Sequence, residues 1–321
     1  MTMEPEYEQQ EERDQDDQFC HHDQQFETPT DLREVEDIIA VMRTKEGTVY
    51  GCCDYLALRN GAERDMVDES WRQRMCEWMY GVVDHCNFRR DIVAVSTAYL
   101  DLCLSRYPEL VESRRCFQLA AMTSLYLAMK VYDTTFIKLE SLVKLGRGLF
   151  QEEDVIRMED RILRRLNWRV HPPTTMCFVR QYLRIFPQTI AASTTYMVSE
   201  ISRFITEISV CLYKFIRYQP SMIAYAAILI AMDGIDDQSL PNWQRQQVYC
   251  RMDNIAKLSH TSVEMQRVMI VLKSSFEKNV NIKELMKTID PNAKPGRGSK
   301  SRRLQQDHNG SPKDVAQTVE C

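Results

Sequence analysis

The chain has 321 residues, of which 44% are hydrophobic and 27% are charged, and its formal net charge is −5. This composition is typical of a soluble globular protein long enough for two ordinary domains, and the acidic balance argues against general nucleic-acid binding. No apolar run reaches the roughly 18–20 residues of a membrane span, and the acidic first residues do not resemble a secretory signal. We therefore expect a cytosolic or nuclear protein without a membrane partner.

The cysteines and histidines do not form a pattern that indicates a metal site. Eleven cysteines are scattered along the chain without a C-x-x-C pair, and only Cys52 and Cys53 are adjacent. In a chain without an export signal, such cysteines are expected to be reduced thiols. The sequence also lacks a phosphate-binding glycine loop, a nucleophile elbow and an H-E-x-x-H motif. We predict no metal, no cofactor and no enzymatic activity.

The two ends of the chain differ from its middle. Residues 1–30 are rich in Glu, Asp and Gln, and they have too few aliphatic residues to form a core, so we expect a disordered acidic tail. Residues 31–45 follow with the apolar spacing of a short amphipathic helix that could dock on the domain behind it. Residues 285–321 form a basic, Gly- and Ser-containing tail. This tail is either a nuclear-import signal or a solvated charge run.

Between the tails, apolar residues recur with helical spacing and no segment alternates like a strand. The first group of predicted helices covers residues 68–86, 91–106, 116–133, 135–145 and 151–167. The third of these is apolar almost all round, which indicates a central, buried helix. The second group covers residues 174–186, 191–212, 221–232, 242–250 and 262–276.

The second group looks like a copy of the first. Leu127-Ala128-Met129 and Ile230-Ala231-Met232 occupy equivalent places 103 residues apart. A repeat of that length indicates two copies of a five-helix unit rather than a short-period solenoid. We predict an all-α fold with an acidic tail (1–30), a docking helix plus first bundle (31–172), a second bundle (173–284) and a basic tail (285–321).

Four charged residues lie on helix faces that the apolar pattern predicts to be buried. Arg72 and Lys130 are positive, whereas Asp101 and Glu159 are negative. An unpaired buried charge would cost several kcal/mol, so each should have a partner. We predict two ion pairs, Arg72 with Asp101 and Lys130 with Glu159.

These residues also carry a resemblance to the cyclin family. The segment Trp71-Arg72-Gln73-Arg74-Met75-Cys76-Glu77-Trp78 resembles the first-box signature M-R-x-x-L-x-D-W. The five residue types that recur in cyclin boxes fall on Arg72, Asp101, Leu119, Lys130 and Glu159. The similarity covers about residues 31–280. It implies two cyclin boxes, with Leu119 in the core of the first and Arg72–Asp101 as its structural pair.

The resemblance implies a function as well as a fold. Cyclins are not enzymes: they bind a cyclin-dependent serine/threonine kinase as a heterodimer and activate it, in most cases to drive the cell cycle. By this resemblance Lys130 and Glu159 would bind polar groups around the C-helix of the kinase. The apolar seat beneath that helix would consist of Val131, Leu163, Trp168 and Val170. A protein of this kind is expected in the nucleus and the cytoplasm.

A second surface of the family is a groove that accepts substrate peptides with an Arg-x-Leu motif. The residues that match its lining are Trp71, Met75, Trp78 and Gln118. Arg74 stands where an aliphatic residue is usual, and Gly81 stands where an acid often meets the arginine of the peptide. Both departures weaken the groove, so either a different peptide preference or no docking would follow.

Two other readings share the fold. A transcription-type cyclin would use the same contact residues with a polymerase-tail kinase. A transcription-factor-B-like protein would contact polymerase and promoter DNA, but such proteins usually carry a zinc ribbon and a basic surface, and this sequence shows neither. We therefore favour a cell-cycle cyclin and expect no direct contact with nucleic acid.

Overall fold

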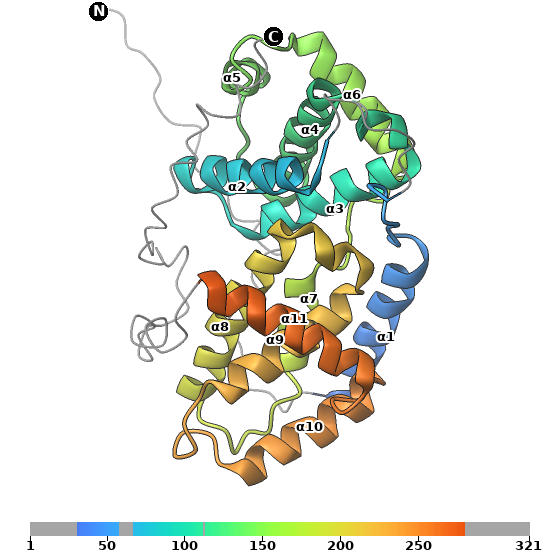
Figure 1. Ribbon diagram of the computed structural model, residues 1–321. Helices are drawn as coiled ribbons and strands as arrows, with labels where there is room; N and C mark the ends of the chain where they lie inside the picture. Colours follow the sequence, from blue (N-terminus) through green and yellow to red (C-terminus); the bar gives the residue numbers. More distant parts are fainter. Residues whose placement is uncertain (1–30, 58–66, 112, 280–321) are drawn as a thin grey trace, which may run out of the picture.

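The computed structural model describes residues 31–57, 67–111 and 113–279, so the two predicted tails lie outside the described residues. Within these ranges the chain forms eleven α-helices, α1 to α11, and no β-strand. Figure 1 shows two helical bundles stacked on one another, with α1 running along their side. The predicted all-α fold with two tandem five-helix units is confirmed.

The first bundle consists of five helices: α2 (Glu69–His85), α3 (Asp91–Arg106), α4 (Arg114–Tyr132), α5 (Leu139–Leu145) and α6 (Glu152–Arg165). The second consists of α7 (Thr175–Leu183), α8 (Ala192–Cys211), α9 (Pro220–Asp233), α10 (Asn242–Ala256) and α11 (Val263–Asn279). The predicted bounds differ from these by a few residues, and the largest differences are at the start of α5 and the end of α10. Helix α5 begins later than residue 135, because the Asp133 carboxylate accepts hydrogen bonds from Thr135 and forms a turn there. Helix α10 continues to Ala256, where Lys257 adopts a left-handed conformation.

Short polar side chains cap several of the helices. The Asp68 carboxylate accepts from the Trp71 amide at 2.9 Å and caps α2. Ser113 caps α4 and Thr174 caps α7 in the same way. Each cap satisfies a backbone N–H that has no partner within the first turn of its helix. The helix boundaries therefore follow largely from local sequence.

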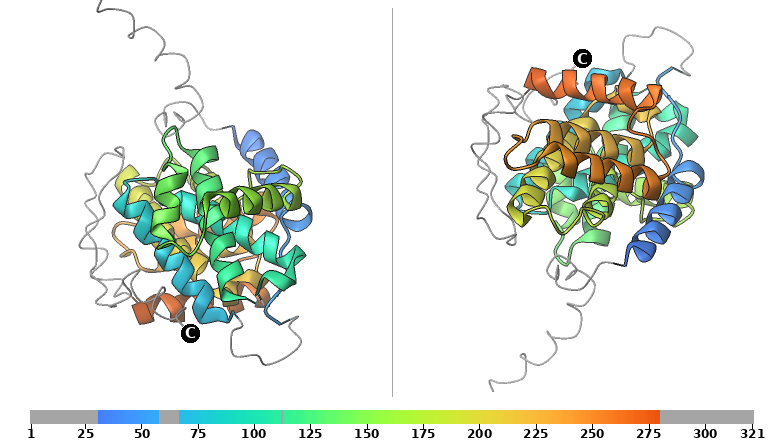
Figure 2. Two further views of the ribbon diagram at one scale, coloured as in Figure 1. Left: turned by 90° about the horizontal axis from the view of Figure 1, so that it is seen from above. Right: turned by 90° about the horizontal axis from the view of Figure 1, so that it is seen from below.

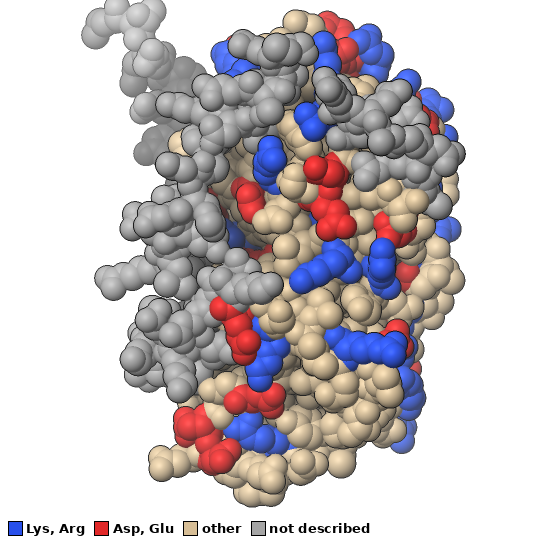
Figure 3. Space-filling model, viewed as in Figure 1, with Lys and Arg blue, Asp and Glu red and all other residues tan. Residues whose placement is uncertain are grey.

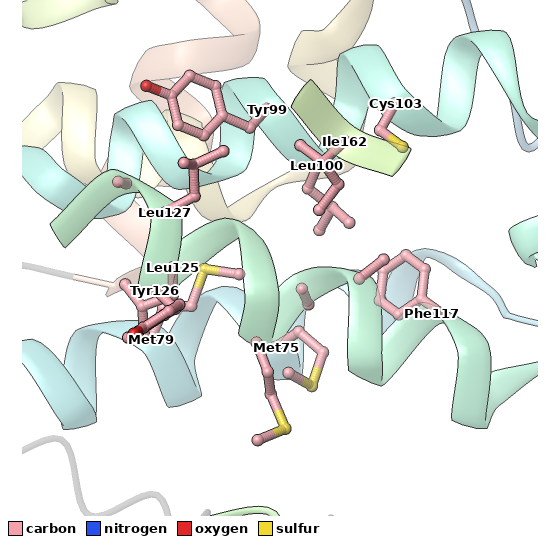
Figure 4. Packing of buried hydrophobic residues seen from close by; sticks show 14 of the residues in the cluster. Met75, Met79, Tyr99, Leu100, Cys103, Phe117, Leu125, Tyr126, Leu127 and Ile162 are labelled. Atoms are coloured by element: carbon pink, nitrogen blue, oxygen red, sulfur yellow. The ribbon is translucent and has the colours of Figure 1, made fainter. Parts of the chain in front are cut away.

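Helix α4 is the centre of the first bundle, as its apolar composition predicted. Every residue from Ala120 to Met129 is buried. Figure 4 shows side chains of α2, α3 and α6, among them Met75, Leu100 and Ile162, converging on this helix. Small residues such as Ala121 and Ala128 let the neighbouring backbones come close. Helix α9 has the same place in the second bundle and is buried from Ser221 to Met232.

Helix α1 (Leu32–Thr48) packs on the second bundle. The sequence-based prediction grouped it with the first bundle, because it precedes that bundle in the chain. Val35 and Ile39 are fully buried in the core of the second bundle. The carboxylate of Glu46 accepts hydrogen bonds from the backbone N–H and the hydroxyl of Ser221, at 2.9 and 2.5 Å. Glu46 therefore caps α9, so a residue of the docking helix completes the central helix of the second bundle.

Polar contacts join the two bundles. Arg90, at the start of α3, pairs with Asp84 and also with Glu207 of α8. Arg180 of α7 pairs with Asp91 of α3. On the face drawn in Figure 3, positive and negative side chains alternate rather than gather by sign. Figure 2 shows the same stacking from above and below, with α1 lying against its edge.

None of the described helices is long and apolar enough to cross a membrane. The described residues also contain no cluster of His, Cys, Asp and Glu that could hold a metal ion. All nine described cysteines are free thiols.

Candidate functional site

Lys130 and Glu159 form an ion pair that joins two helices of the first bundle. Lys130 lies in the last turn of α4, and Glu159 lies in the middle of α6. The Lys130 ammonium also lies 4.7 Å from the centre of the Tyr126 ring. A cation near an aromatic face is attracted by the negative π-face, so Tyr126 helps to fix the position of Lys130. The Lys130 ammonium is thus held by the Glu159 carboxylate and by the Tyr126 ring.

The position of this pair corrects one expectation. We predicted faces that are buried, but the Lys130 side chain is 30% exposed and the Glu159 side chain 16% exposed. The end of α4 emerges from the core, so its last charged residue reaches solvent. Lys130 is exposed and Glu159 is half-buried, so both groups are partly accessible to a partner.

The four apolar residues of the predicted kinase seat differ in their exposure. Val131, Leu163 and Val170 are half-buried and pack against the first core. Trp168, directly after α6, is 68% exposed, and its backbone adopts a left-handed conformation with φ of 60°. The hydroxyl of Tyr99 donates to the carbonyl of Val170 and anchors the segment that follows Trp168. The residues that the resemblance assigned to the kinase seat therefore lie near the surface of the first bundle.

Two further exposed apolar residues were not identified from the sequence. Phe136 is 53% exposed, and its ring meets the Tyr126 ring edge-on with centroids 6.4 Å apart. Ile156 is exposed on α6, one turn before Glu159. At both positions the sequence shows an apolar residue outside the regular spacing of the neighbouring apolar residues. That irregularity was the signal from which their exposure could have been predicted. Large exposed apolar side chains beside a polar pair are typical of an interaction surface.

Arg72 and Asp101 form the second predicted pair, and this one is buried. Its carboxylate also accepts a hydrogen bond from the Tyr55 hydroxyl at 2.8 Å, a partner that the sequence did not indicate. Burial disfavours the charge of Arg72, but the Asp101 carboxylate, together with Cys76 and Tyr55, outweighs burial and holds the pKa of Arg72 well above its usual value. The two side chains are only 4% and 10% exposed, so most of this pair lies inside the protein.

The residues that match the substrate groove are not exposed. Trp71, Met75, Trp78 and Gln118 are all buried. The guanidinium groups of Arg74 and Arg114 lie over the Trp71 ring, 5.4 and 5.0 Å from its centre. Two cations therefore lie over the Trp71 ring, and docking of a substrate peptide on α2 stays a prediction. Leu119, expected in the core, is half-buried and packs at its edge.

The chain matches two family models over most of its length. Residues 37–171 match the model described as cyclin, N-terminal domain, and residues 173–293 match the model described as cyclin, C-terminal domain. The chain belongs to the cyclin family. The assignment made from the sequence, a cyclin of the cell-cycle type, is confirmed. Cyclins are regulatory subunits and generally are not catalytic.

Similar proteins are found among plants. The chain is 27% identical over 165 residues to Cyclin-A1-4 of Oryza sativa subsp. japonica, an alignment covering 51% of this chain and 45% of the relative. It is 26% identical over 202 residues to Cyclin-B2-2 of Oryza sativa subsp. indica, covering 63% and 45%. The matched region spans less than half the length of these two curated relatives.

A solved structure shares the fold. The chain matches a viral cyclin from herpesvirus saimiri with a TM-score of 0.55 and 13% identity, over 78% of this chain and 99% of the viral chain. At that identity the likeness concerns the arrangement of helices alone.

Proposed function

We propose that this cyclin binds a cyclin-dependent serine/threonine kinase and activates it to drive cell-cycle progression. The observation that carries the proposal is the partly solvent-accessible Lys130–Glu159 pair, which joins α4 and α6 and has the exposed Ile156 one turn before Glu159. Family membership supports the partner class, since cyclins are regulatory subunits.

The geometry suits recognition of helix ends and backbone groups. An ammonium has three N–H donors and a carboxylate has about four acceptor sites, so the mutual ion pair leaves most of them unused. Lys130 would donate to carbonyl oxygens of the kinase C-helix region, and Glu159 would accept from its N–H groups. Because the pair is already assembled, little side-chain freedom is lost on binding.

The apolar residues would provide most of the buried area. Trp168, Leu163 and Val131 would contact the kinase C-helix, with Val170 at the edge. A kinase becomes active when its C-helix moves inward and brings a conserved glutamate to the lysine that holds the ATP phosphates. A cyclin that packs on the outer face of that helix stabilises the inward position, and the cyclin itself needs no catalytic group.

The proposal is tested by co-purification of the full chain with candidate cyclin-dependent kinases, followed by a histone-type kinase assay. We expect Lys130→Ala with Glu159→Ala to lower the affinity for the kinase by about 30- to 1,000-fold, the range of interface hot spots. The matched control is Glu140→Ala with Lys144→Ala, which removes an exposed ion pair of α5 at 2.6 Å. Equal affinities of the two double variants would refute the assigned contact.

We also propose that the protein acts in both nucleus and cytoplasm. The support is the basic stretch with Lys294, Arg297 and Lys300, which lies outside the described residues. A fluorescent fusion should lose its nuclear fraction when these three residues are changed to Ala. An unchanged distribution would assign the stretch to a solvated charge run.

A further inference from the structure

A cluster of arginines lies on the side of α6 that faces away from the Lys130–Glu159 pair. Arg161 follows Glu159 by two residues, which turns it by about 200° around the helix axis. Arg165 is one turn further along, and Arg106 at the end of α3 donates a hydrogen bond to the Arg165 carbonyl oxygen. We name Arg106, Arg161 and Arg165 the α6 basic cluster.

The contacts of the cluster show that its charges are close together. The Arg165 guanidinium stacks on the Tyr107 ring, 3.3 Å from its centre. Burial raises the pKa of the neighbouring Cys103 thiol to about 11, and the positive charges of Arg165, Arg106 and Arg161 all act against that rise. Glu109 is the negative group that acts on the same thiol. Three cations therefore face one anion.

Two members of the cluster lack a counter-charge. Elsewhere on α6, Arg157 pairs with Asp154 and Arg164 pairs with Asp160. Among the described residues, Arg161 and Arg165 make no ion pair. The Nε of Arg165 is buried and has no hydrogen-bond partner within the described part of the chain. Arg161 is exposed, and an exposed guanidinium without an ion pair can bind a carboxylate through two parallel hydrogen bonds.

The sequence supplies an anionic segment that fits this surface. Residues 1–30 contain ten Asp and Glu residues and one Arg, a net charge of −9 before histidine is counted. We propose that this acidic segment, which lies outside the described residues, docks in cis on the α6 basic cluster. This inference is independent of the proposed kinase partner.

The distances allow the contact. Helix α1 has 17 residues and is about 25 Å long at 1.5 Å per residue. Its C-terminal end lies at the cluster, because Arg106 donates to the Val49 carbonyl at 3.1 Å. Figures 1 and 2 show α1 running along the side of the bundles toward α3. The 14 residues from Asp17 to Thr30, which precede Asp31, reach at most about 50 Å, twice the length of α1. Tethering raises the effective concentration of the acidic groups at the cluster.

The test uses the full chain with a photo-reactive benzoylphenylalanine in place of Gln15, which stands between acidic residues. After irradiation at low salt, mass spectrometry maps the cross-links. We expect cross-links to α6 and the end of α3, within single molecules. Arg161→Glu with Arg165→Glu should lower their yield at least about tenfold, because attraction becomes repulsion. Salt at 0.5 M should have a similar effect, because it screens exposed charges within a few ångströms.

The matched control reverses two exposed cations of the second bundle, Arg267→Glu with Lys273→Glu, and should leave the yield unchanged. Circular dichroism melts of both double variants establish that each remains folded. An equal loss of yield in both variants would overturn the proposal. So would cross-links that map to the basic residues after 293, or cross-links that form only between molecules and rise with concentration.

Discussion

Arg72 and Asp101 are joined by two parallel hydrogen bonds, from Nε to Oδ1 at 2.9 Å and from Nη2 to Oδ2 at 2.7 Å. The remaining Nη1 of Arg72 donates to the carbonyl oxygens of Val210 and Cys211, at the end of α8. Helix ends leave their last carbonyls without intrahelical partners and carry partial negative charge. A pair inside the first bundle therefore also holds the second bundle in place.

Removing one partner of this pair should destabilise the protein strongly. Asp101→Ala leaves the Arg72 charge buried and should cost about 3–5 kcal/mol. For a protein of this size the melting temperature should fall by roughly 6–20 °C. Differential scanning calorimetry measures the change. Asp160→Ala, which removes the partner of the exposed Arg164, should alter the melting temperature by only about 2 °C.

The double variant Arg72→Met with Asp101→Leu completes this experiment. It removes both buried charges, so it should be less destabilised than Asp101→Ala. If Asp101→Ala lost no more stability than Asp160→Ala, the buried pair would have no structural importance.

Glu46 should make the stability depend on pH. Burial raises the pKa of the Glu46 carboxyl, while the hydrogen bonds from Ser221 and the charge of Arg43 partly oppose the rise. A carboxyl whose pKa is higher in the folded state contributes stability below its unfolded value and loses it as pH rises through the folded value. Ionised Glu46 is therefore the less favourable form of the docked helix.

The variant Glu46→Gln removes this titration and keeps groups that can bond to Ser221. The difference in melting temperature, Glu46→Gln minus the parent chain, should increase between pH 4.5 and pH 8. Comparing the two proteins at each pH cancels the pH dependence that comes from carboxyls whose pKa is lowered, such as Asp54 and Asp68. A difference that stays constant with pH would contradict the assignment.

Trp168 should affect binding and not folding. Its side chain is 68% exposed, so Trp168→Ala should change the melting temperature by only about 2 °C. Under the proposed function Trp168→Ala should lower the affinity for the kinase about 10- to 100-fold, because exposed tryptophans are frequent interface hot spots. Calorimetric titration with the kinase measures this loss. Trp243→Ala, at a 60% exposed tryptophan of α10, is the matched control and should bind normally.

Two glycines of the first bundle should respond oppositely to alanine. Gly81 lies inside α2, and an added Cβ would meet no atom within 4 Å. Gly81→Ala should therefore stabilise the protein by about 0.5–1 kcal/mol, because alanine favours the helix more than glycine does. Gly148 has φ of +76°, so Gly148→Ala should cost about 1–2 kcal/mol. Urea denaturation distinguishes the two outcomes, and changes of the same sign would refute the prediction.

Much of this architecture was determined by local sequence. Helical spacing, caps such as Asp68 and the all-round apolar composition of α4 depend on residues a few positions apart, and the ten bundle helices followed from them. Pairing Arg72 with Asp101 and Lys130 with Glu159 also followed, because a charge on an otherwise apolar face requires a partner.

The tertiary structure alone decided how far each residue is buried and which distant segment covers it. It places α1 on the second bundle, leaves Lys130 exposed and Glu159 half-buried, and covers Trp71 with Arg74 and Arg114. It also brings Phe136 to Tyr126 and Arg106 to the end of α6. The physical reason is that exposure and pairing depend on packing between segments far apart in the chain, whereas helical periodicity reports only which side of its own helix a residue occupies.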